Sequence, residues 1–183
     1  MSFSDADLIA RVLAQEDQNA FSELVHRYQS PVRAFLTRMT HGDSHLADDL
    51  AQETFLKAWQ KLRTFRGDAR FSTWLFGIAF NELRSACRHR KELAWDDTDT
   101  VPAFEALAAA RQTHLCLDLK EALKLLTPPE RAAVILCCQN GLSHDEAAHA
   151  LNCPLGTVKT NILRGREKLK RRLAMAYEHY ESV

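Results

Sequence analysis

Apolar residues recur three and four positions apart along most of this chain, and that spacing is the period of an amphipathic α-helix. The longest such repeat runs from Phe21 to Met39. Pro31 lies inside it and is expected to kink or restart the helix, because proline lacks the amide hydrogen that an interior turn needs. No stretch alternates strictly between apolar and polar residues for long enough to indicate a strand. We therefore expect an all-α fold.

Helix start and stop signals are clearest in the last third of the chain. Two capping boxes, Thr127 to Glu130 and Ser143 to Glu146, each place an acid three residues after a hydroxyl side chain. Asn152-Cys153-Pro154 then ends a short helix, and a longer one follows with Val158 and Ile162 on its inner stripe. A short capped helix, a tight break and a longer helix are typical of a helix-turn-helix.

Residues 92–113 separate two helical parts. This segment turns acidic, contains Val101-Pro102 and has no sustained apolar stripe. We expect it to be an acidic flexible linker between two small helical domains, residues 1–91 and residues 114–183, the second containing the helix-turn-helix.

Composition narrows the classes further. The chain has 183 residues, of which 46% are hydrophobic, so wholesale disorder is excluded. Its longest apolar run has about half the length that a bilayer-spanning helix needs, and its first residues lack the basic start of a signal peptide. We expect a cytoplasmic protein without membrane insertion. Five cysteines without framework spacing predict no disulfide scaffold.

The formal net charge is zero, but the charge is unevenly distributed. Residues 159–172 hold seven basic side chains and one acidic side chain, a composition suited to phosphates. With the inner stripe buried, four residues of this helix point outward and could read base edges: Lys159, Thr160, Leu163 and Arg164. The alternative is the solvated basic face of an ordinary amphipathic helix.

A second group of residues combines aromatics and arginines around the loop 65–71 and the helix that follows it. Stacking surfaces beside phosphate partners suit unpaired bases, and an asparagine can read the edge of a flipped base. The candidates for this surface are Phe65, Arg66, Arg70, Trp74, Asn81, Arg84 and Arg88. In the alternative reading Phe65, Phe71 and Trp74 fill the core and the arginines are solvated.

A third group is acidic and lies opposite the inner stripe of the predicted helix that follows His41-Gly42-Asp43. It consists of Asp48, Asp49, Gln52, Glu53 and Leu56. An exposed leucine ringed by acids resembles the anchor of a protein interface with a polar rim. The alternative is a face that is simply hydrated.

Signals of catalysis and of metal binding are missing. The sequence has no C-x-x-C, no H-E-x-x-H, no glycine-rich phosphate loop and no G-x-S-x-G elbow. A redox or metal sensor built from Cys137, Cys138 and Cys153 is a weaker alternative to ordinary core cysteines. We expect no cofactor, no metal and no enzymatic activity.

Three segments in this order, residues 48–55, 65–75 and 155–160, resemble the bacterial RNA polymerase sigma factors of the sigma-70 family, group IV or extracytoplasmic-function (ECF) type. The resemblance implies an alternative sigma factor that directs promoter-specific initiation. It implies that the acidic face docks on the β′ clamp helices of core RNA polymerase and that the chain also contacts the β subunit. It implies that the linker threads towards the active-site cleft and the RNA exit path of the polymerase. It further implies that an anti-sigma factor holds the protein inactive until a stress or envelope signal arrives.

The same resemblance assigns the two DNA surfaces. The aromatic loop with Trp74 and Asn81 would capture the melted minus-ten strand, and the outward face at Lys159 would read the duplex minus-thirty-five element. The rival interpretation is a stand-alone helix-turn-helix regulator that binds duplex DNA as a dimer. Gly165 lies in the long helix, where it lowers helix stability unless it permits close packing.

Overall fold

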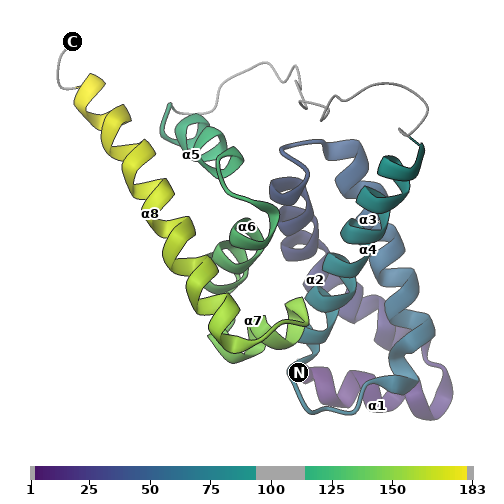
Figure 1. Cartoon of the computed structure of the whole chain (residues 1–183). Coiled ribbons are helices and arrows are strands. Elements are labelled where there is room, and N and C mark those ends of the chain that lie inside the picture. The colour runs from purple at the N-terminus through teal and green to yellow at the C-terminus, as the bar shows by residue number, and fades with distance from the viewer. Residues whose placement is uncertain (1–2, 94–113, 181–183) are drawn as a thin grey trace.

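The computed structural model describes residues 3–93 and 114–180, and within them every regular element is helical. Two groups of helices lie side by side (Figure 1). The N-terminal group consists of α1 (Asp5–Gln15), α2 (Gln18–Met39), α3 (Ser44–Lys61), the short 3₁₀ turn η1 (Leu62–Thr64) and α4 (Phe71–Leu93). The C-terminal group consists of α5 (His114–Lys124), α6 (Pro128–Val134), the π turn η3 (Ile135–Gln139), α7 (His144–Leu151) and α8 (Leu155–Tyr180). The expected all-α class is confirmed; most of the predicted linker lies outside the described residues.

Helix α2 runs through Pro31 as one element of 22 residues, so the expected restart does not occur. Val32, Phe35 and Leu36, which follow the proline directly, are completely buried. Because each buried apolar side chain stabilises the packed helix by about 1.5–3 kcal/mol, their packing outweighs the one backbone hydrogen bond that proline removes.

The cap signals of the C-terminal group function as predicted. Thr127 and Glu130 form one capping box and Ser143 and Glu146 form the other. Asn152 ends α7 in the left-handed conformation, with φ of 49°, which asparagine tolerates better than most residues. Helices α7 and α8 therefore form the expected helix-turn-helix.

Gly165 lies where α8 crosses the rest of its own domain. A Cβ atom there would lie 2.7 Å from Cγ2 of Val134 and 3.1 Å from Cδ2 of Leu126. This glycine is buried, and the close packing that would justify it is present.

The two groups share one hydrophobic core. Buried residues of α2 and α4, such as Phe35 and Leu75, belong to the same cluster as Leu136, Ala147 and Val158 of the C-terminal group. A small separate cluster of Leu123, Leu126 and Val134 lies under Leu169. The arrangement is therefore closed, with the C-terminal domain seated on the N-terminal one.

Arg131 of α6 is buried between the two domains and forms hydrogen bonds to both of them. Its side chain is 2% exposed and donates to the backbone oxygens of Leu123 and Leu126, both at 2.9 Å, inside its own domain. It also donates to the backbone oxygen of Met39, at 3.2 Å, at the end of α2. The guanidinium forms no ion pair with any side chain that the structure describes. Backbone carbonyl oxygens therefore accept most of its hydrogen bonds.

No helix among the described residues is both long enough and apolar enough to cross a bilayer.

Candidate nucleic-acid and polymerase interfaces

The outward face of α8 carries the side chains that the sequence predicts for duplex DNA. Val158 and Ile162 are buried against the domain, which turns the intervening residues to solvent. Lys159, Thr160, Leu163 and Arg164 are all exposed, and Leu163 is 69% exposed. A leucine this exposed between two cations gains nothing from folding, whereas it could contact a thymine methyl group. We call these four residues the recognition face.

Within the recognition face, Thr160 donates its hydroxyl hydrogen to the backbone oxygen of Gly156 at 2.9 Å. The oxygen of that hydroxyl keeps free lone pairs, so Thr160 can still accept a hydrogen bond from a base. Lys159 and Arg164 have no ion-pair partner among the described side chains, which leaves both cations available for phosphates or guanine edges.

The aromatic loop is partly core and partly surface. Phe71 is buried, whereas Phe65 and Trp74 are half-buried. The three rings form one cluster with centroid distances of 5.8 Å (Phe65–Phe71), 5.3 Å (Phe65–Trp74) and 5.6 Å (Phe71–Trp74). Both readings of the sequence therefore hold in part: the rings support the domain core, and two of them keep an edge in solvent where a base could stack.

Arg70 at the end of this loop is 61% exposed and pairs with an acidic side chain of the C-terminal domain. Its Nε and Nη2 atoms both donate to the carboxylate of Glu146 on α7, the latter at 2.5 Å. The guanidinium lowers the pKa of Glu146 to about 2, together with the backbone amide of Ser143. The carboxylate is thus charged at neutral pH and forms a bidentate pair with Arg70.

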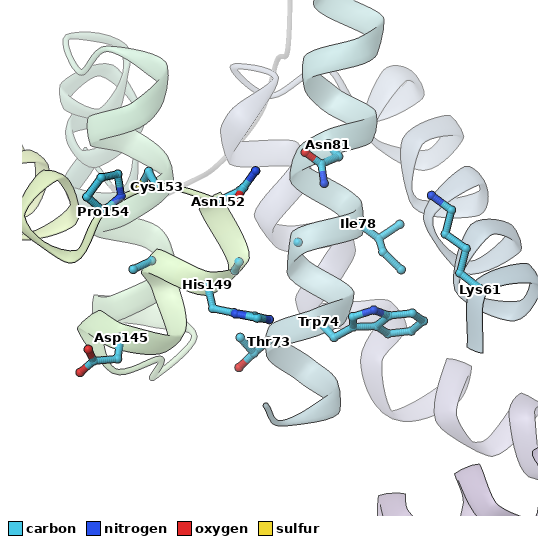
Figure 2. Close-up of a pocket in the computed structure, with 13 residues that line it drawn as sticks. Lys61, Thr73, Trp74, Ile78, Asn81, Asp145, His149, Asn152, Cys153 and Pro154 are labelled. Atoms are coloured by element: carbon cyan, nitrogen blue, oxygen red, sulfur yellow. The ribbon is translucent and has the colours of Figure 1, made fainter. Parts of the chain in front are cut away.

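Trp74 and Asn81 line a cleft of about 810 Å³ between α4 and α7 (Figure 2). Asp145, His149 and Asn152 of α7 line its other wall, and His149 points toward α4. A second cleft of about 870 Å³ lies beside the loop, between Arg70 and α7. The cleft thus adjoins the C-terminal domain, but Asn81 is exposed, and Trp74 points from α4 toward the side where Lys61 lies (Figure 2).

The remaining predicted residues of this surface are accessible. Arg66, Arg84 and Arg88 are exposed, as predicted. The guanidinium of Arg84 lies 6.0 Å from the centre of the Phe80 ring, a cation–π contact that holds it along α4.

The acidic face of α3 lies opposite the buried residues Ala47, Leu50 and Ala58. Asp49, Gln52, Glu53 and Leu56 are exposed, Leu56 by 50%. Asp48 differs from its neighbours, because its carboxylate pairs with Arg33 of α2, with Nη2 and Oδ2 3.0 Å apart. This pairing lowers the pKa of Asp48.

An apolar groove that was not predicted from the sequence adjoins Leu56. Phe21 of α2 and Phe55 and Trp59 of α3 line a hollow of about 410 Å³. The rings of Phe21 and Trp59 meet edge to face with centroids 4.9 Å apart. A side chain from a partner helix could insert here, with the acids forming a polar rim.

The cysteines are more exposed than expected. Cys138 is exposed rather than in the core, because the π turn Ile135–Gln139 holds an extra residue per turn and rotates it out of the buried stripe. Cys137 and Cys153 are half-buried, and burial raises the pKa of both thiols. Among the described residues no three His, Cys, Asp or Glu side chains are grouped so that they could hold a metal ion.

Sequence reasoning missed the residues that join the two domains. Arg70 and Glu146 are 76 residues apart, and Arg131 and Met39 are 92 apart, so no local pattern relates them. The one available signal was Gly77, a glycine in the middle of an apolar helix. A Cβ atom at Gly77 would lie 3.3 Å from the backbone oxygen of Ala150 on α7.

Comparisons with known proteins agree with this geometry. Residues 24–92 match the family model of sigma-70 region 2, and residues 116–169 match that of sigma-70 region 4. The RNA polymerase sigma-H factor of Pseudomonas aeruginosa is 32% identical over 182 residues, which cover 92% of this chain and 93% of that protein. The ECF RNA polymerase sigma-E factor of Escherichia coli K12 is 34% identical over 181 residues, covering 91% of this chain and 92% of that protein.

Two solved structures are similar as well. The sigma factor RpoE from Bartonella quintana, in complex with the anti-sigma factor NepR, has a TM-score of 0.70 and 30% identity over 84% of this chain and 96% of its own. CnrH, in complex with the cytosolic domain of CnrY, has a TM-score of 0.66 and 28% identity over 93% of this chain and 97% of its own. Because relatives at 32–34% identity match nearly end to end, the chain belongs to the sigma-70 family of RNA polymerase sigma factors, and within it to the ECF type.

Proposed function

We propose that this chain binds core RNA polymerase in the cytoplasm and directs it to a defined set of promoters, without enzymatic activity of its own. The observation that carries this proposal is the recognition face, where Leu163 is 69% exposed between Lys159 and Arg164 on the second helix of a helix-turn-helix. Such a face can contact base edges in the major groove. In the sigma-70 family the protein that makes this contact is bound to core RNA polymerase, so recognition of the DNA positions the polymerase. In this proposal the face contacts the minus-thirty-five element as duplex.

The acidic face and its groove are the proposed polymerase site. Asp49, Gln52 and Glu53 offer charge and hydrogen bonds that suit a basic helix, and Leu56 with the groove beside it offers the apolar anchor. In the family this partner is the pair of clamp helices of the β′ subunit. Asp48 would support the site indirectly, since its carboxylate holds Arg33 against the start of α3.

The aromatic loop is the proposed minus-ten site. Phe65 and Trp74 would stack with unpaired bases, Asn81 would read the edge of an extruded base, and Arg66, Arg70, Arg84 and Arg88 would neutralise phosphates. A base that is already unpaired costs less to extrude than one in a duplex, so the loop would act on a melted strand.

An anti-sigma factor is the proposed regulator. The similar sigma factor RpoE was solved in complex with the anti-sigma factor NepR, and the similar protein CnrH was solved in complex with the cytosolic domain of CnrY. A partner that covers the acidic face or the recognition face would compete with polymerase or promoter by mass action alone.

Run-off transcription tests the proposed function. The template carries the promoter upstream of the chain's own gene, and purified bacterial core polymerase is supplied with and without the chain. We expect a full-length transcript only when the chain is added. Failure to initiate at every tested promoter, together with tight duplex binding by the chain alone, would instead favour the stand-alone regulator.

A further inference from the structure

A hollow of about 480 Å³ lies between the π turn, the start of α7 and helix α8. Cys137 and Cys138 line it from the π turn, His144 from α7, and Ile162 and Arg166 from α8. Its volume falls within the range of about 300–1,000 Å³ that is usual for small-molecule sites. It shares no lining residue with the two clefts beside α4. We call it the thiol hollow.

The two thiols of the hollow differ in their access to solvent. Cys138 is exposed, whereas Cys137 is half-buried. The thiol of Cys137 donates a weak hydrogen bond to the backbone oxygen of Ser143, with sulfur and oxygen 3.9 Å apart. Burial, and then the charges of Cys138 and Glu146, raise the pKa of Cys137, which keeps it protonated. Because the thiolate is the form that attacks a disulfide, Cys138 is the thiol that can react with a reagent from solution.

The positive charge in the thiol hollow comes from Arg166. Its side chain is exposed and forms no ion pair with any side chain that the structure describes. Reactive cysteines typically lie in electropositive, partly exposed surroundings of this kind. A guanidinium binds carboxylates well, and the ring N–H of His144 offers a further donor. The hollow therefore suits a thiol reagent that carries carboxylates.

Two other kinds of cysteine chemistry fit the geometry poorly. Among the described residues no three His, Cys, Asp or Glu side chains are grouped so that they could hold a metal ion. Adjacent residues of a helical turn do not face each other, so Cys137 and Cys138 could form a disulfide only if the π turn unwound. Exchange of one thiol with an external disulfide requires no such change.

We propose that Cys138 is a site of reversible modification, at which it forms a mixed disulfide with an anionic low-molecular-weight disulfide. The Cys138 thiol loses its proton to water, and the thiolate attacks one sulfur of the reagent. A new S–S bond forms to Cys138 while the S–S bond of the reagent breaks, and the other half leaves as a thiolate that takes up a proton. The Cys138 sulfur is oxidised and the leaving sulfur is reduced by the same amount.

The position of the hollow links this modification to DNA binding. Arg166 follows Lys159 by seven residues, about two helical turns, so both lie on the same side of α8. The carboxylates of a mixed disulfide beside Arg166 would lower the positive potential along that side of the helix. The effect on duplex binding rests on the proposed function, whereas the reaction of Cys138 does not.

The first experiment measures the reaction itself. The reduced full chain is treated with oxidised glutathione, which is anionic, or with cystamine, which is cationic, and mass spectrometry of its peptides locates the adducts. We expect oxidised glutathione to modify Cys138 faster than Cys87, an exposed thiol of α4 outside the hollow. Arg166→Gln should slow the reaction of Cys138 with oxidised glutathione at least about threefold without slowing that with cystamine. Lys170→Gln, which removes an exposed charge outside the hollow, is the matched control and should change neither rate.

Three results would overturn the proposed site. They are the absence of an adduct on Cys138, a disulfide between Cys137 and Cys138 in its place, and a rate with oxidised glutathione that is the same in Arg166→Gln and the wild type. Cys137→Ser should still form the adduct, because Cys138 is the thiol that attacks.

The second experiment measures the affinity of the modified chain for a duplex with the minus-thirty-five element of a promoter that the chain transcribes. We expect binding at least about threefold weaker than that of the reduced chain, a difference that shrinks as salt is added and disappears after treatment with a reductant. Cys138→Ser treated in the same way is the control, because it keeps any adduct at other cysteines. Equal affinity of the modified and reduced wild type would overturn the control of DNA binding by Cys138.

The two proposals fail in different ways. Transcription by the wild type with core polymerase, combined with no adduct on Cys138, would overturn the modification site and leave the sigma function intact. An adduct on Cys138 that depends on Arg166, without transcription at any promoter, would overturn the proposed function, while the modification site itself would be established.

Discussion

Arg131 and His41 hold each other across the boundary between the two domains, with Nη1 of the arginine 2.9 Å from Nε2 of the histidine. A guanidinium can only donate, so Nε2 of His41 must accept and the neutral ring carries its proton on Nδ1. Protonation of His41 would remove that acceptor and place a second cation against a buried one. Closure of the two domains is therefore linked to the protonation of one histidine.

This linkage predicts that acid favours the open chain. Burial first, and then the positive charges of Arg131 and Lys124, lower the pKa of His41, while Glu121 opposes them. In the open chain His41 should titrate near its ordinary pKa of about 6.5. The closing contribution is then complete above about pH 6.5 and declines as the pH falls below it, because only the open form binds the proton there. Solution scattering of the free chain between pH 7.5 and pH 5.5 should show a rising radius of gyration.

The variant His41→Asn isolates this residue. His41 has a positive φ of 59°, which asparagine adopts readily, and asparagine does not titrate in this range. We expect the radius of this variant to be independent of pH over the same interval, whereas His45→Asn, at an exposed position of α3, should behave like the wild type. A variant that keeps the full pH response would assign the effect to another group.

Glu53→Lys should weaken binding to core polymerase at least about tenfold, because it reverses a charge in the proposed polar rim beside Leu56. Helicity by circular dichroism should not change, since Glu53 is exposed and lies opposite the buried face of α3. Affinity is measured by anisotropy of labelled chain against core polymerase, with Gln15→Lys, exposed at the end of α1, as the charge control. Unchanged affinity for core polymerase would mean that the interface does not lie on α3.

Arg164→Ala should weaken binding to the cognate minus-thirty-five duplex by about 1–3 kcal/mol if the guanidinium contacts a base edge. The comparison is Arg171→Ala on the same helix, where the side chain already pairs with Glu167 at 2.5 Å. Titrations use the cognate duplex and one with a scrambled element. A loss of equal size on both duplexes would reassign Arg164 to phosphate contact.

Two glycines of α8 should respond to alanine with opposite signs. At Gly165 a methyl group would press on Val134 and Leu126, so Gly165→Ala should destabilise the fold by about 1–2 kcal/mol despite its better helix propensity. At Gly156 nothing lies within 4 Å of an added Cβ, so Gly156→Ala should stabilise by about 0.4–1 kcal/mol. Urea unfolding of both variants measures the difference; stabilisation at both positions would mean that α8 packs less closely than described.

The features that sequence could predict are those set by neighbours along the chain. Ser143 and Glu146 form their capping box within one helical turn, and Asn152 ends the same helix locally. The buried positions Val158 and Ile162 follow from the helical period, and this also fixes which side chains of α8 face outward. All four residues predicted for the recognition face are accordingly exposed.

The features that could not be predicted from the sequence depend on contacts between segments that are far apart along the chain. Glu146 was identifiable as a cap, but its second bond to Arg70 requires the orientation of one domain on the other. Arg131 looks like an ordinary helical cation until the end of α2 is brought over it and buries it. Cys138 was misplaced for a local reason, since the helical period assumes 3.6 residues per turn and the π turn departs from it.

Both domains belong to one chain, and 20 residues, 94–113, join them. Closure is therefore an intramolecular equilibrium governed by an effective concentration, which for short connections is in the millimolar range and does not depend on how many copies a cell contains. Dilution cannot open such a chain, and higher expression cannot close it further. The closed fraction would be constant across expression levels, and it would respond instead to acidity through His41 or to an added partner.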